Sequence, residues 1–175
     1  GVSRETPTLP QPGSPRIMVV ANQKGGVGKT TTAVNIAAGL ASGGLKVLVV
    51  DIDPQGNAST ALGVEHGEGT PGTYEVLVDQ EPIIDTIQRC PDLLGVWVLP
   101  ATIDLAGAEI GLVASVSRET RLKTALDAFF DHYYVDYVLI DCPPSLGLLT
   151  LNALVAAHEI MIPIQCEYYA LEGVT

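Results

Sequence analysis

Short apolar runs recur along the chain and predict the strands of a sheet. Each run is rich in Val, Ile or Leu, and none alternates polar with apolar positions. That pattern is typical of strands that are buried on both faces, as in a parallel sheet. The runs lie at 17–20, 47–50, 95–99, 137–140 and 160–164.

The segments between these runs space their apolar residues as helices do. They lie at 29–42, 82–88, 104–114, 117–131 and 146–157, and Asp104 and Ser145 are candidate N-caps of two of them. Regular alternation of strand and helix predicts a mainly parallel sheet with helices on both faces, a three-layer α/β/α domain. Right-handed crossovers then place the strand-to-helix loops at one edge of the sheet, where ligands bind.

Three stretches do not follow this alternation. Residues 1–15 hold several prolines and almost no apolar periodicity, so we expect a flexible tail before a single domain at 16–175. The glycine-rich stretch 54–72 is the longest irregular segment and a candidate mobile loop. Residues 167–175 resemble the first turns of a helix with no stop signal, so we expect the domain to be incomplete at its C-terminus.

Composition and charge narrow the function classes. The chain has 175 residues, of which 47% are hydrophobic and 17% charged, which is typical of one globular domain. Nine Lys and Arg against twenty Asp and Glu give a net charge of −11, which offers no basic surface for nucleic acid. No apolar run is long enough to span a membrane, and no secretory leader is apparent. Three scattered cysteines do not form a disulfide framework or a zinc motif, so we expect a cytoplasmic protein.

A glycine-rich loop between the first strand and the first helix carries the most specific chemistry. Glycines allow several backbone N–H groups to point at a phosphate, and the helix that follows adds its dipole. Lys29 would then bridge the β- and γ-phosphates, and the Thr30 hydroxyl would ligate Mg²⁺. The predicted nucleotide-binding residues are Lys24, Gly25, Gly26, Val27, Gly28, Lys29, Thr30 and Thr31.

Carboxylates follow two of the predicted strands at the same edge of the sheet. Asp51 and Asp53 are two residues apart, so their side chains point the same way on an extended backbone. Transfer of a phosphoryl group to water needs charge near the metal and a group that orients the water. Asp53 could orient the water, and Asp141, directly after the fourth run, suits an outer-shell Mg²⁺ ligand.

The loop departs from the standard phosphate loop in a way that points to a family. Gln23 stands where the standard loop has glycine, and Lys24 is an additional early lysine. The string Lys-Gly-Gly-Val-Gly-Lys-Thr at 24–30 resembles the deviant loop of the MinD/ParA group of P-loop ATPases. With Asp-x-Asp-Pro-Gln-Gly-Asn at 51–57, Asp-Cys-Pro-Pro-Ser at 141–145 and the string at 163–173, residues 16–175 resemble the ParA/Soj-type chromosome-partitioning ATPases, most closely the actinobacterial chromosomal branch.

The resemblance implies a weak ATPase that uses ATP and Mg²⁺ and forms a homodimer on binding ATP. It also implies non-specific DNA binding without membrane insertion, and a ParB-type centromere-binding partner that stimulates hydrolysis. In the family, the adenine-contacting strand and most DNA-binding residues follow the segment that matches Gly173, so we expect them beyond Thr175. Transferred by motif, the resemblance implies that Lys24 acts in trans and Lys29 in cis. It makes Thr30 and Asp141 metal ligands. Asp53 would be the hydrolytic carboxylate, and Asp51 a further candidate metal ligand.

Other functions fit parts of the same pattern. A MinD-like selector of the division site shares the loop but needs an amphipathic C-terminal helix, and a ParA-like ATPase could instead position a plasmid or other cargo. A metabolic ligase or small-molecule kinase would need a substrate pocket, and a scaffold that only binds nucleotide would not need Asp53. The isolated histidines and the small basic cluster are expected to be structural or surface residues: His66, His132, His158, Arg118, Arg121 and Lys123.

Overall fold

A six-stranded sheet forms the centre of the domain. The structure, a computed structural model, describes residues 8–21 and 27–162, without the side chains of 27–31. The strands are β1 (Arg16–Val20), β2 (Val47–Asp51), β3 (Gln88–Arg89), β4 (Val96–Leu99), β5 (Tyr137–Asp141) and β6 (Glu159–Met161). Their order is β3-β4-β2-β5-β1-β6, and every pairing is parallel except that of β3 with β4. The predicted mainly parallel sheet is therefore confirmed.

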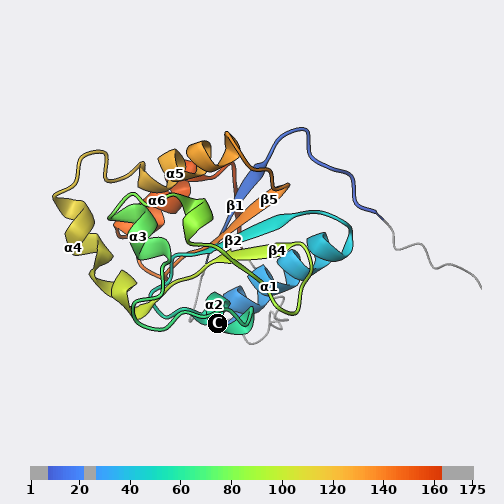
Figure 1. The fold of residues 1–175 in the computed structure, drawn as a ribbon, viewed down its shortest axis with the longest axis horizontal. Helices are drawn as coiled ribbons and strands as arrows, with labels where there is room; N and C mark the ends of the chain where they lie inside the picture. The colour runs from blue at the N-terminus through green and yellow to red at the C-terminus, as the bar shows by residue number, and fades with distance from the viewer. Residues whose placement is uncertain (1–7, 22–26, 163–175) are drawn as a thin grey trace, which may run out of the picture.

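Helices cover both faces of this sheet, as Figure 1 shows. The α-helices are α1 (Val27–Ser42), α2 (Asn57–Ala61), α3 (Thr73–Leu77), α4 (Ala108–Val113), α5 (Arg121–Phe130) and α6 (Leu148–Ala156), and two 3₁₀ turns are η1 (Ile83–Asp85) and η2 (Ile103–Gly107). One face of the sheet packs on α1, and the opposite face packs on α3, α5 and α6. This arrangement is the expected three-layer α/β/α domain.

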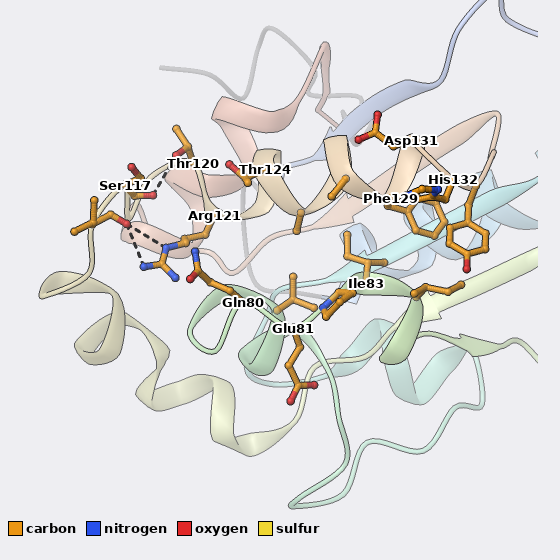
Figure 2. Close-up of a pocket in the computed structure, with 17 residues that line it drawn as sticks. Gln80, Glu81, Ile83, Ser117, Thr120, Arg121, Thr124, Phe129, Asp131 and His132 are labelled. Atoms are coloured by element: carbon orange, nitrogen blue, oxygen red, sulfur yellow. Dashed lines mark hydrogen bonds between the residues drawn. The ribbon is translucent and has the colours of Figure 1, made fainter.

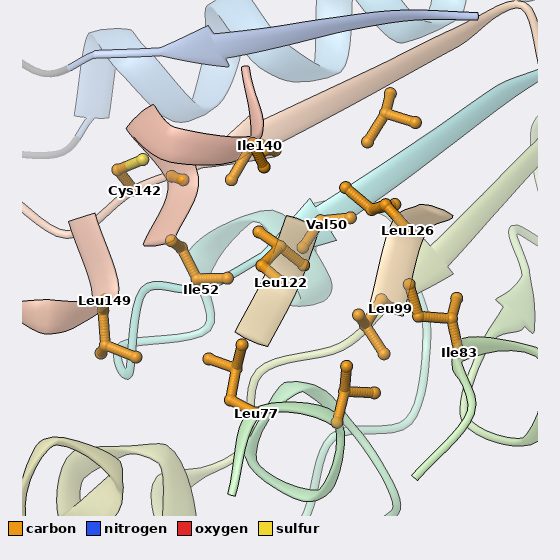
Figure 3. Close-up of a cluster of buried hydrophobic side chains, with 14 of the residues drawn as sticks. Val50, Ile52, Leu77, Ile83, Leu99, Leu122, Leu126, Ile140, Cys142 and Leu149 are labelled. Carbon is orange, nitrogen blue, oxygen red and sulfur yellow. The ribbon is translucent and has the colours of Figure 1, made fainter. Parts of the chain in front are cut away.

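Alternate residues of each strand supply the two cores. On β2, Val47 and Val49 pack toward α1, whereas Leu48 and Val50 pack into the larger cluster shared with α5 and α6. Figure 3 shows this larger cluster, in which side chains from the strand ends meet those of the helices. Each buried Leu, Ile or Val contributes about 1.5–3 kcal/mol. Burial on both faces explains why the strands are apolar throughout.

Two buried polar side chains fix the elements around this core. Asn152, in the middle of α6, accepts a hydrogen bond from Leu122 N at 3.1 Å and donates to Arg118 O at 2.8 Å, so it holds the N-terminal end of α5. At the N-terminal ends of β2 and β5, Asp136 accepts from Lys46 N at 2.7 Å and from Gln11 Nε2 at 3.2 Å. Leu9 N also donates to Gly43 O at 2.9 Å. Residues 8–15 therefore contact the domain although they form no helix or strand.

Several predicted elements differ from the structure. The helix expected at 82–88 is wrong: η1 makes a single turn, Thr86 Oγ1 donates to Ile83 O at 2.8 Å, and Gln88 and Arg89 pair with β4. One turn is enough to bury Ile83, so a short element accounts for the apolar spacing that suggested a helix. The stretch 54–72, expected to be irregular, contains α2.

Three of the other predicted helices, at 104–114, 117–131 and 146–157, are shorter than expected or divided. The segment 104–114 divides at Gly107 into η2 and α4, and α5 begins at Arg121 because Ser117 adopts a left-handed turn at φ 54°. The expected N-caps are also wrong, because Thr102 and Gly147 stand at those positions and neither makes a side-chain cap bond. The Asp104 carboxylate accepts instead from Gly69 N at 3.3 Å, and the carbonyl of Ser145 accepts from Thr150 Oγ1 at 2.6 Å.

Candidate nucleotide site

The sheet brings the ends of three motif-bearing strands together. β5 lies between β1 and β2, and its last residue, Asp141, pairs with Val20 on one side and with Asp51 on the other. Ile52 N also donates to Asp141 O at 3.0 Å, which continues the pairing beyond the strands. Two of the three carboxylates predicted at the ligand edge, Asp51 and Asp141, are therefore on neighbouring strands, and Asp141 lies directly beside the strand that leads to the glycine-rich loop.

The helix that follows this loop begins at the same edge. α1 starts at Val27, two residues before the predicted start, and its sixteen residues direct the positive end of the helix dipole toward this edge. Lys24, Gly25 and Gly26 lie outside the described residues, and no side-chain position is described for Val27, Gly28, Lys29, Thr30 or Thr31. The roles assigned to these residues remain predictions.

Asp51 is buried and accepts hydrogen bonds on both oxygens. Its Oδ1 accepts from Asp53 N at 3.1 Å, and its Oδ2 accepts from Ser59 N at 2.9 Å and from Ser59 Oγ at 2.7 Å. The pKa of Asp51 is raised to about 7: burial raises it most, the hydrogen bond from the Ser59 hydroxyl lowers it, and the neighbouring Asp141 raises it. The carboxylate therefore stands in an environment where a nearby cation would stabilise its charged form.

Asp53 lies at the start of the loop that follows β2. The residue is only 4% exposed, and its Oδ1 accepts from Gln55 N at 3.0 Å. Its carbonyl accepts from Gly56 N at 2.8 Å, so residues 53–56 form a tight turn. This turn holds the Asp53 carboxylate close to the strand ends and away from bulk water.

The segment that follows β2 is hydrogen-bonded to the end of β4 as well as to β2, a feature that the sequence did not predict. Ser59 Oγ accepts from Ala101 N at 3.0 Å while it donates to Asp51. Thr73 Oγ1 lies 2.6 Å from Asp51 O and 3.1 Å from Pro100 O, within donating distance of both carbonyls. Ser59 lies in α2 and Thr73 is the first residue of α3, and neither position has a sequence pattern that marks it as a partner of the strand ends.

His66 and Gly56 complete this packing. His66 Nε2 lies 2.9 Å from Thr60 Oγ1, and His66 Nδ1 lies 3.2 Å from Ala101 O. Gly56 has φ 66°, and a Cβ there would lie 2.8 Å from His66 Nδ1 and 3.1 Å from Ala101 O. The loop therefore needs glycine at this position both for its backbone conformation and for its close approach to β4.

The carboxylates are compatible with a divalent cation that is held mainly by a ligand. Within residues 8–21 and 27–162, no three His, Cys, Asp or Glu side chains gather as a metal site. Mg²⁺ commonly uses one or two carboxylates together with phosphate oxygens and water. Adjacent Asp51 and Asp141 supply such a donor set, and a cation beside them would offset their mutual repulsion.

A pocket of about 810 Å³ lies elsewhere, between η1, α3 and α5 (Figure 2). Its lining combines apolar side chains such as Ile83 and Phe129 with a polar rim, and none of its residues comes from the strand ends. Arg121 in this rim donates to Val116 O at 3.1 Å, so its guanidinium secures the turn before α5. The pocket is therefore separate from the candidate nucleotide site. No helix in the part of the chain that the structure describes is long and apolar enough to cross a membrane.

Comparison with known proteins gives consistent matches over most of this chain. Residues 15–175 match the model of a family described as an AAA domain. The sporulation initiation inhibitor protein Soj of Bacillus subtilis is 56% identical over 160 residues, which cover 91% of this chain and 62% of that protein. The chromosome partitioning protein ParA of Myxococcus xanthus is 54% identical, with 91% of this chain and 56% of that protein covered. The chain thus spans about three fifths of the length of these relatives.

A solved structure gives a similar result for the fold. Cobyrinic acid a,c-diamide synthase from Mycobacterium smegmatis, with a bound ATP analogue and magnesium, superposes with a TM-score of 0.79 at 47% identity. The match covers 91% of this chain and 64% of that one. The placement of this chain in the actinobacterial branch stays a prediction.

The close approach at Gly56 gives a testable prediction. Gly56→Ala should lower the free energy of unfolding by about 1–3 kcal/mol, because the new Cβ meets Ala101 O and the backbone is held in the left-handed region. Gly39→Ala is the matched control, since nothing lies within 4 Å of its Cβ position in α1, and it should stabilise by about 0.5–1 kcal/mol. Denaturant unfolding of both variants measures the difference, and equal stabilities would contradict the described loop conformation.

Proposed function

The chain belongs to the ParA/Soj family of partitioning ATPases, and we propose that it is the nucleotide-binding part of an ATP-dependent switch that moves DNA. The switch binds ATP with Mg²⁺, dimerises, and returns to the monomer by slow hydrolysis to ADP and phosphate. The observation that carries this proposal is the side-by-side placement of Asp51 and Asp141, with Asp141 next to the strand that enters the glycine-rich loop. Phosphoryl transfer needs positioned charge of this kind at one point.

The proposed roles divide between binding and hydrolysis. The backbone of 24–31 and the N-terminal end of α1 hold the phosphates, with Lys29 on the β- and γ-phosphates. Mg²⁺ neutralises phosphate charge when bound, held by Thr30 and Asp141, with Asp51 as a further carboxylate beside it. Asp53 orients the attacking water from the turn after β2. Lys24 supplies positive charge to the phosphates of a second subunit.

The proposed partners are a second copy of the chain, DNA and a ParB-type protein. Nine basic and twenty acidic residues give this chain a net charge of −11, which disfavours contact with DNA phosphates. We therefore assign DNA contact to parts of the full-length protein outside residues 1–175. The protein would act in the cytoplasm on the nucleoid, and its hydrolysis would rise when a ParB-type partner binds.

An ATP-dependent ligase is the second candidate function. It is favoured by the similarity to a solved structure at 47% identity, which is that of a diamide synthase. The relatives at 56% and 54% identity are instead named Soj and ParA. The two functions differ in their co-substrate: the switch forms ADP from ATP and water alone, whereas a ligase needs a carboxylate substrate and an amide donor.

Variants of the two loop lysines should separate ATP binding from assembly. Lys29→Ala removes the charge aimed at the bound phosphates, so the full-length protein should lose measurable ATP affinity in calorimetry. Lys24→Ala should bind ATP normally but remain a monomer, because its charge serves the partner's nucleotide. Light scattering with ATP checks the second result. Normal ATP-dependent dimers of Lys24→Ala would exclude a role in trans.

A variant of Asp53 should separate binding from hydrolysis. Asp53→Ala leaves the glycine-rich loop at 24–31 and Asp141 in place, so we expect an ATP-bound dimer. Its turnover should fall on the order of a hundredfold or more and should not respond to a ParB-type activator. Turnover with and without activator, and dimer fraction by size-exclusion chromatography, check this outcome. Near-normal turnover would remove Asp53 from the mechanism, and loss of ATP binding would place it in the metal site.

A further inference from the structure

We propose that Ser59 is the positioning residue for hydrolysis: through Asp51 it holds the turn that carries Asp53 in its working geometry. This inference rests on the proposed ATPase function and adds a residue outside the loop at 24–31 and outside the carboxylate motifs. Ser59 lies in α2, six residues beyond Asp53, and is fully buried.

The hydroxyl of Ser59 joins two strands through the loop. It donates to Asp51 Oδ2 at 2.7 Å and accepts from Ala101 N at 3.0 Å, so its proton and one lone pair are both used. The backbone N–H of Ser59 donates to the same Asp51 oxygen at 2.9 Å. One serine thus connects the ends of β2 and β4 and fixes the start of α2 against both.

The other oxygen of Asp51 reaches the hydrolytic residue itself. Asp51 Oδ1 accepts from Asp53 N at 3.1 Å. A single buried carboxylate therefore fastens both ends of the loop at 53–59, one end through Asp53 N and the other through Ser59. Between them, Gln55 N donates to the Asp53 carboxylate and fixes its orientation.

This linkage matters because the proposed task of Asp53 is geometric. A displacement of about 1 Å in a positioning group costs on the order of a hundredfold in rate, whereas phosphate binding depends on residues elsewhere. Removing the Ser59 hydroxyl leaves Asp51 Oδ2 with only one of its two bonds and leaves Ala101 N without its acceptor. Because both groups are buried, the loop is expected to shift until water or another group satisfies them.

The test compares turnover with nucleotide affinity in the full-length protein. Ser59→Ala should lower kcat by roughly tenfold to a hundredfold while the Kd for ATP stays within about threefold of wild type. Ser59→Thr keeps the hydroxyl and should retain most of the turnover. Ser59→Cys, a weaker hydrogen-bond donor, should fall between the two. Thr86→Ala is the matched control, because it removes a buried hydroxyl bonded to Ile83 O at 2.8 Å outside the site, and it should leave kcat unchanged.

The outcomes distinguish this inference from the function on which it rests. Wild-type kcat in Ser59→Ala, or in Ser59→Cys if the alanine variant does not fold, overturns the positioning role and leaves the ATPase proposal standing. A parallel loss of ATP affinity, or an equal loss of turnover in Thr86→Ala, also overturns it, because the effect would then be on binding or on general stability. Absence of ATP turnover in the wild-type protein, with DNA and a ParB-type partner present, would remove both proposals.

Discussion

The parallel register of β5 with its two neighbours is the constraint on which the site depends. Asp141 is level with Val20 on β1 and with Asp51 on β2, so a shift of either pairing by one residue would separate these three positions. Packing favours this register, because alternate strand residues pack on α1 or on α3, α5 and α6, and a one-residue slip would bring each set against the wrong helices. The packing of the strands in the core therefore determines where Asp51 and Asp141 lie.

Because Asp51 is buried, its charge state and the conformation of the loop after β2 depend on each other. Asp51 has no exposed surface, and burial raises its pKa to about 7 although it accepts three hydrogen bonds. Those bonds come from the loop after β2, so the loop can leave its place only by leaving a buried carboxylate unsatisfied. The same bonds hold Asp53. If Asp53 orients water as proposed, the bonds from Gln55 N to its carboxylate and from its own N–H to Asp51 would preorganise it for that task.

The sequence was sufficient for the features that depend on long, repeated patterns. Fully apolar strands alternating with helices predicted the parallel sheet, and the glycine-rich string placed the loop between β1 and α1. Short elements were harder, because the apolar spacing at 82–88 fits one 3₁₀ turn as well as a helix. The bonds of Ser59 could not be foreseen, since Ala101 is distant from it in sequence and meets it only once β4 lies beside β2. The N-caps failed for a related reason: Asp104 bonds to Gly69, a residue brought close by tertiary packing.

The central claim is that the ends of β1, β5 and β2 form one site for ATP and its metal. The most direct test is a crystal structure of the full-length protein with a non-hydrolysable ATP analogue and Mn²⁺ in place of Mg²⁺, in which anomalous scattering locates the metal. We expect the phosphates at the N-terminal end of α1 and the metal next to Asp141, bound directly or through one water molecule. Nucleotide and metal located away from these strand ends, for example in the pocket between η1 and α5, would contradict the account.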